Sequence, residues 1–162
     1  MTRRALWVVS AAVVLLGSSV QAQIIAIHAD LIGANETPPN ASPAVGACDG
    51  TLDKATGDIA VSCAYQDLLG PRTASHIHRA PAGVAGPVII PLSGAGPASG
   101  AIGPVLGVLS AADVDLAKIQ GLYINIHSTV FPGGEIRGQI TPEPATLALL
   151  GVGVAALLRR RR

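Results

Sequence analysis

The chain has 162 residues, a length typical of one domain, and its 11 basic and 10 acidic side chains leave a net charge of +1. Aromatic residues make up only 2% of the sequence, so small aliphatic side chains must fill any core. Between residues 23 and 141, five basic residues against nine acidic ones give a net charge of −4, and this region has no basic run, which excludes nucleic acid as a partner.

The first 22 residues have the pattern of a secretory signal peptide. Residues 1–4 include two arginines, residues 5–16 form an apolar segment, and residues 20–22 form a small-x-small cleavage site. We therefore expect signal peptidase to remove residues 1–22 and to leave an exported domain over residues 23–141.

The exported domain has the composition of an all-β fold. Frequent Gly and Pro, short β-branched segments and one helix-like segment favour a sandwich or a barrel. We expect an antiparallel, Greek-key-like β-sandwich with one short helix, flanked in the precursor by the signal helix and a C-terminal hydrophobic helix. The first strand is expected over residues 25–31, where His28 is interpreted as an ordinary strand residue, and a turn-rich loop follows over residues 33–40.

Two cysteines lie in the next predicted hairpin, whose four-residue loop spans residues 54–57. If Asp53 pairs with Asp58, Cys48 pairs with Cys63, and their Cα atoms come within about 4.5–5.5 Å, which is disulfide range. Export favours that disulfide, which we expect to be structural; two reduced, buried cysteines are the alternative.

The central segment contains two histidines one residue apart. Residues i and i+2 of a strand point to the same face, so His76 and His78 are expected on one face and Ile77 on the other. Gly and Pro residues between positions 81 and 87 then predict a constrained turn, and residues 88–92 predict another strand.

One short helix is predicted near the end of the domain. Residues 93–107 are expected to form a long surface connection with at most one strand, which would start near residue 102. Ser110 and Asp113 have the spacing of a capping box, and Gly121 ends the segment. We expect this helix to close one end of the fold and to have no catalytic role.

The last hairpin carries the remaining polar residues. Alternation in its first strand places three polar side chains on one face, Tyr123, Asn125 and His127. Alternation in its second strand places three more together, Glu135, Arg137 and Gln139. The two polar faces are expected to lie side by side.

The C-terminal tail has three parts: a Pro-Glu-Pro motif, an apolar segment over residues 145–158 and an arginine cluster, namely Pro142, Glu143, Pro144, Arg159, Arg160, Arg161 and Arg162. Fourteen helical residues rise about 21 Å, less than the roughly 30 Å hydrocarbon core, so we expect transient membrane insertion with the arginines on the cytoplasmic side.

The tail, residues 142–162, resembles the PEP-CTERM sorting signal of exported bacterial proteins. The resemblance implies a Gram-negative source, an inner-membrane-associated precursor, an exosortase-type sorting protease that cuts near the Pro-Glu-Pro, and delivery to the cell surface or extracellular matrix. A plain C-terminal membrane tail is the alternative.

The domain resembles the chordin-type, or CHRD, domain over roughly residues 24–141. The resemblance rests on separated segments in order, namely residues 36–39, 73–78, 82–88, 123–127 and 134–140. The resemblance implies an extracellular module but indicates little about its mechanism.

Three hypotheses follow for the polar residues. His76, His78 and His127 either form a structural network with Glu135, Asn125 or a loop backbone, or bind one copper or zinc ion. Acid–base catalysis by a His–Glu pair is the third, but no nucleophile motif accompanies it. Arg137 is expected to form an ion pair with Glu135 or a neighbouring acid, or to bind an anionic ligand.

The leading functional prediction is a non-enzymatic module at the bacterial surface or in the extracellular matrix, with extracellular polysaccharide or matrix proteins as partners. The alternative is a mononuclear copper- or zinc-binding protein that uses His76, His78 and His127. Enzymatic activity is not predicted.

Overall fold

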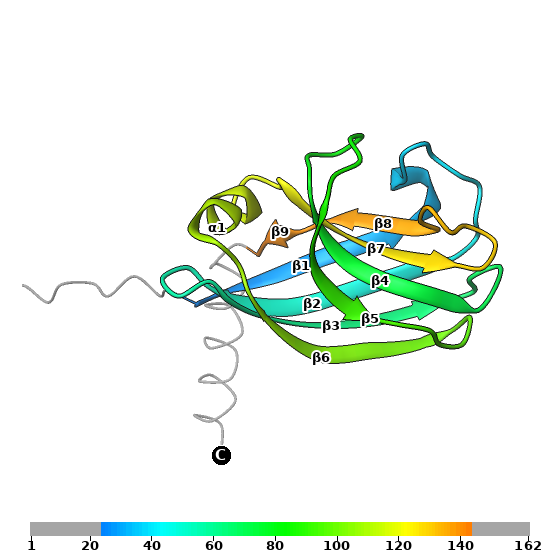
Figure 1. The fold of residues 1–162 in the computed structure, drawn as a ribbon, viewed down its shortest axis with the longest axis horizontal. Coiled ribbons are helices and arrows are strands. Elements are labelled where there is room, and N and C mark those ends of the chain that lie inside the picture. The colour runs from blue at the N-terminus through cyan, green and yellow to red at the C-terminus, as the bar shows by residue number, and fades with distance from the viewer. Residues whose placement is uncertain (1–23, 144–162) are drawn as a thin grey trace, which may run out of the picture.

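The computed structural model describes residues 24–143, which form one antiparallel sheet of nine strands and one short α-helix (Figure 1). The elements are β1 Ile24–Ile32, η1 Gly33–Asn35, β2 Val45–Asp53, β3 Asp58–Gln66, β4 Arg72–Arg79, β5 Val88–Ser93, β6 Gly100–Val108, α1 Ala111–Ala117, β7 Leu122–Ser128, β8 Ile136–Gln139 and β9 Thr141–Pro142. The expected signal peptide, C-terminal apolar segment and arginine cluster lie outside the described residues. Within residues 24–143, no helix has the length and apolar character needed to cross a membrane.

The all-β antiparallel prediction with one short helix is confirmed. The strand order is β5-β4-β7-β8-β1-β2-β3-β6, with β9 on β1. Strand β8 pairs with β7 and also meets β1 at Arg137 and Ile32, so both halves of the expected sandwich belong to one curled sheet. The free edges, β5 and β6, approach each other at Ile90 and Gly107, which nearly closes the sheet into a barrel.

Aliphatic side chains fill the interior, as the composition predicts. Leu31, Leu52, Ile77 and Ile126 are all fully buried, and Tyr65 is the aromatic member of the core cluster in the described part of the chain. Removing one such aliphatic side chain from water contributes roughly 1.5–3 kcal/mol, so the interior holds the strands together without aromatic packing.

The cysteine hairpin forms as predicted. Cys48 pairs with Cys63 across β2 and β3, and the two residues form a disulfide with a Cα–Cα separation of 4.0 Å. The connecting loop spans residues 54–57, and Gly57 adopts a φ of +82°, a conformation that favours glycine. The Gly57 N–H donates to the Asp53 carbonyl at 2.8 Å and closes the turn.

Helix α1 covers one end of the barrel (Figure 1). Its N-cap, Ser110, accepts a hydrogen bond from the Asp113 N–H at 3.2 Å, as the capping-box spacing predicts. The Asp113 carboxylate accepts two hydrogen bonds from Arg79, at the end of β4, and this lowers the pKa of Asp113. The helix is thus tied to the sheet by a bidentate ion pair.

Loops cover the outer face of β4, β7 and β8. The β4–β5 loop, residues 80–87, stands above these strands in Figure 1, and the segment after β1 lies beside it. Leu122, Ile124 and Ile126 point inward as predicted, but Tyr123 and Asn125 on the outer face are only 3% and 2% exposed. The polar face predicted for the surface is therefore largely enclosed.

Candidate functional site

Three histidines converge on the outer face of β4 and β7. His76 and His78 alternate with Ile77, which is fully buried in the core, so both imidazoles point outward. Strand β7 runs antiparallel to β4 with Asn125 opposite His76, and this register brings His127 to the same face. Strand alternation and pairing together account for the convergence.

The three rings lie at metal-binding distances from one another. Each histidine offers one nitrogen, and the three nitrogens lie within 4.8 Å of each other. The closest pair is His76 Nδ1 and His127 Nε2, at 3.2 Å. The three histidines are therefore a candidate metal site, in which bonds of about 2.0–2.1 Å would require all three nitrogens to lie within about 4.2 Å of one another.

Backbone carbonyls set the orientation of two of the rings. His78 Nδ1 lies 2.9 Å from the Gly86 carbonyl, and His127 Nδ1 lies 2.9 Å from the Pro132 carbonyl. A carbonyl oxygen only accepts, so both Nδ1 atoms carry the hydrogen and both Nε2 atoms keep a lone pair. Metal-binding histidines are commonly held in this way, with the second nitrogen donating to a backbone carbonyl.

Burial favours the neutral form of the three imidazoles. The pKa of His76 is lowered by burial and then by the neighbouring histidines. Burial also lowers the pKa of His78, with a further contribution from the charge of Arg137, and lowers the pKa of His127. Neutral imidazole is the form that can bind a metal ion.

Tyr123 separates His78 from Arg137. The rings of His78 and Tyr123 stack with centroids 4.7 Å apart, and the Arg137 guanidinium lies 3.4 Å from the Tyr123 centroid. The Tyr123 hydroxyl accepts a hydrogen bond from the Gly86 N–H at 3.2 Å. Gly86 therefore contacts both His78 and Tyr123 and ties the β4–β5 loop to the histidine cluster.

The expected close ion pair of Arg137 does not form within residues 24–143, although the charge of Glu36 opposes the lowering of the Arg137 pKa by burial. Its side chain is 1% exposed, and its five N–H groups donate to Thr37, Gln139 and the carbonyls of Pro81 and Val84. None of these donors reaches Glu135 or another carboxylate within residues 24–143. Arg137 fastens the β4–β5 loop to the barrel, which leaves no free donor for an anionic ligand.

Glu135 does not join the histidines. It is fully buried, and its Oε1 accepts hydrogen bonds from the Ser42 hydroxyl at 2.6 Å and the Leu69 N–H at 2.7 Å. The chain reaches Glu135 from a turn, before β8 begins, and the side chain points to two loops that alternation cannot predict. Of the three partners expected for the histidines, Glu135 is therefore not one, whereas loop carbonyls are.

Glu36 is a site residue that the sequence did not reveal. It is 7% exposed, and its Oε1 accepts a hydrogen bond from Asn125 Nδ2 at 3.2 Å. Burial raises the pKa of Glu36. The only sequence signal is the turn over residues 36–39, because 89 positions separate Glu36 from Asn125.

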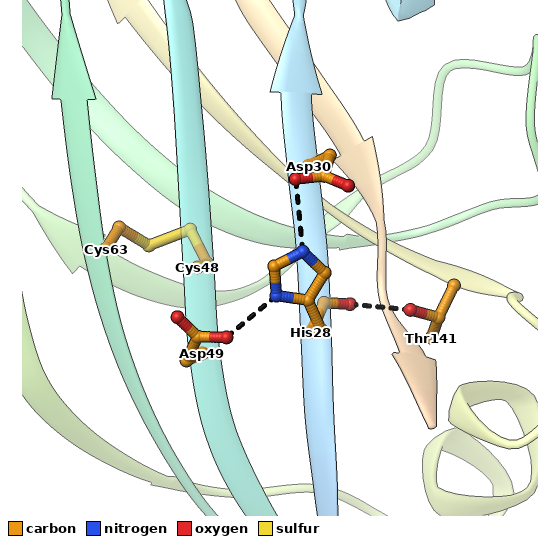
Figure 2. Close-up of polar contacts among 6 residues, drawn as sticks. All are labelled: His28, Asp30, Cys48, Asp49, Cys63 and Thr141. Carbon is orange, nitrogen blue, oxygen red and sulfur yellow. Dashed lines mark hydrogen bonds and ion pairs between the residues drawn. A yellow bond between two sulfur atoms is a disulfide. The ribbon is translucent and has the colours of Figure 1, made fainter. Parts of the chain in front are cut away.

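A second polar cluster surrounds His28 on β1 (Figure 2). Its Nδ1 lies 2.7 Å from Asp49 and its Nε2 lies 3.1 Å from Asp30, while Thr141 donates to the His28 carbonyl at 3.0 Å. The hydrogen bond to Asp49 raises the pKa of His28. Instead of an ordinary strand residue, His28 is the centre of a partly exposed ion-pair cluster.

Comparisons with known proteins agree with both resemblances, to the CHRD domain and to the PEP-CTERM signal. A family model described as the CHRD domain matches residues 27–140, and a model described as the PEP-CTERM protein-sorting motif matches residues 141–162. Neither the curated proteins nor the solved structures include a match to the chain.

Proposed function

This chain belongs to the CHRD domain family, and on that premise we propose that it is a non-enzymatic binding module of the cell surface or extracellular matrix. Its sorting motif marks an exported protein that exosortase-type machinery delivers to the cell surface. Extracellular polysaccharide and matrix proteins are the partners we propose for the sorted domain.

The position of Glu135 carries the non-enzymatic part of the proposal. A general acid–base pair needs its two groups within hydrogen-bond reach of the same reacting atom. Glu135 is instead fully buried against Ser42 and Leu69, while His78 and His127 donate to backbone carbonyls. The arrangement favours binding over proton transfer.

Surface sorting and matrix binding can be tested together in a Gram-negative host that contains an exosortase. We expect the full-length chain to be processed, recovered with the surface fraction, and to sediment with purified matrix polysaccharide. A variant with Arg159, Arg160, Arg161 and Arg162 changed to alanine is the matched control and should remain unprocessed. Processed protein that stays in the supernatant when the polysaccharide is sedimented would contradict the binding role.

A second candidate function is the binding of one metal ion by His76, His78 and His127. The observation that favours it is the convergence of three neutral imidazoles with their nitrogens within 4.8 Å. We expect His78→Ala to abolish binding of zinc or copper at micromolar concentration, measured by titration against a chromophoric chelator. Binding that survives alanine substitution of each histidine in turn would rule this function out.

A further inference from the structure

Asn125 occupies the centre of the face on which the histidines meet. It pairs with His76 on β4 and with Arg137 on β8, and it lies two residues from His127 on β7. Strand alternation directs all of these side chains to the same side of the sheet. An ion held by the three histidines therefore lies next to the Asn125 carboxamide.

Glu36 fixes the direction of that carboxamide. Asn125 Nδ2 donates to Glu36 Oε1 at 3.2 Å, and both residues are buried. With Nδ2 committed to Glu36, Asn125 Oδ1 has no hydrogen-bond partner among residues 24–143. A buried carbonyl oxygen without a donor is unfavourable, which indicates that a group supplies one.

His78 Nε2 is a second buried acceptor without a partner in the described part of the chain. Its Nδ1 donates to Gly86, so Nε2 has only a lone pair to offer. While the His78 ring is neutral, these two buried acceptors cannot satisfy each other. A metal ion that takes the Nε2 lone pair, and whose bound water donates to Oδ1, satisfies both atoms.

Resting on the proposed metal-binding function, we propose that Asn125 is a positioning residue of a Zn(II)- or Cu(II)-type site and holds the ligand in its fourth coordination position. The three imidazoles suit these borderline ions, and three protein ligands leave a position for water or a small protic ligand. In known metal sites, carboxylates that do not touch the ion hydrogen-bond the ligating histidines and fix their orientation. Glu36 has the same orienting role toward Asn125.

Zinc affinity of the full-length chain, purified from the envelope in non-ionic detergent, tests this role. Because outer-sphere partners typically change affinity about 10- to 100-fold, we expect Asn125→Leu to weaken zinc binding within that range. Asn125→Asp alone would set an oxygen against Glu36 where Nδ2 now donates, so it is combined with Glu36→Gln, whose amide can donate back. The combined variant moves the carboxylate next to the divalent ion, so we expect it to bind zinc about 10-fold or more tightly. In both variants the d–d absorption of bound Co(II) should change, which a purely structural role would not produce.

Asp115→Asn is the matched control, because it changes an exposed side chain outside both groups of possible metal ligands and should leave zinc affinity unchanged. If His78→Ala abolishes binding while both Asn125 variants bind zinc like the unmodified chain, the role of Asn125 is overturned and the metal site stands. If all three histidine variants bind normally, the metal-binding function itself fails. Should Asn125→Leu not fold, the combined variant decides the question alone.

Discussion

The His28 ring lies between two carboxylates, so its contribution to stability depends on pH. The pKa of His28 is raised, first by the hydrogen bond to Asp49. Because its folded pKa lies above the unfolded value of about 6.5, the stabilisation is complete below the unfolded pKa and is lost as pH rises through the folded pKa.

We therefore expect Asp49→Asn to lower the free energy of unfolding at about pH 5.5 and to leave it nearly unchanged at about pH 9. Since Asp49 is exposed, the loss should stay below about 1 kcal/mol. Urea unfolding at the two pH values measures it. Asp115→Asn is the control, because it also removes an exposed carboxylate, but one whose partner is Lys118 and not a histidine. An equal loss at both pH values in Asp49→Asn would contradict a role for protonated His28.

Strand alternation predicted which face the site side chains point to better than it predicted how deeply they are buried. Alternation was sufficient to place His76, His78 and His127 on outer faces. It could not show that loops cover Asn125, or that Arg137 satisfies the carbonyls of one of those loops. The direction of a side chain depends on local backbone geometry, whereas its burial depends on segments far away in the sequence.

Among the elements, β8 joins the two halves of the sheet, and Gly138 makes its approach to β1 possible. A Cβ atom at Gly138 would overlap the carbonyl oxygen of Asp30, a backbone atom that cannot rotate away. We expect Gly138→Ala to lower the free energy of unfolding by about 3 kcal/mol, at the upper end of the range for overpacking.

Urea denaturation of Gly138→Ala measures this loss. Gly94→Ala is the matched control, because a Cβ atom there would have no heavy atom within 4 Å. A change below about 0.5 kcal/mol in Gly138→Ala, the size of an ordinary surface substitution, would show that β8 can move away from β1 without loss.

The β2–β3 hairpin is the element for which the sequence was most informative. A four-residue loop fixed the pairing of its strands, and the pairing placed Cys48 opposite Cys63. Loop-closure entropy for the intervening segment suggests that replacing both cysteines with alanine lowers the free energy of unfolding by about 3 kcal/mol.

Guanidinium unfolding with and without reductant measures the disulfide contribution. Reduction should destabilise the unmodified chain by the same amount as the double substitution and should not affect the double variant. If the double variant is as stable as the oxidised chain, the disulfide is not a structural constraint.

At the scale of the whole molecule, composition predicted the fold class but not the closure of the sheet. The frequent Gly and Pro residues and the scarcity of aromatics indicated strands around an aliphatic core, and the structure confirms this core, although β1, β2, β3 and β6 are each nine residues long. Which strands become neighbours is a non-local property. Strand β8 is four residues long, and no local pattern shows that it contacts both β7 and β1.

The last strand constrains where the sorting protease can cut. Strand β9 contains Thr141 and Pro142, and the Glu143 N–H donates to the Ala26 carbonyl at 2.9 Å. A cut before Thr141 would remove this strand from the barrel, so we expect the processed protein to end beyond Glu143. Mass spectrometry of the processed C-terminus measures this, and a product that ends at or before Glu143 would contradict it.

The pairing of β9 with β1 also sets folding and sorting in competition for the same few residues. Proteins that bind an extended peptide as an added strand need its backbone groups free, but those of β9 are engaged by β1. The motif becomes available to such an enzyme when β9 separates from the barrel. The stability of the two residue pairs between β9 and β1 then limits how readily such an enzyme can reach the motif.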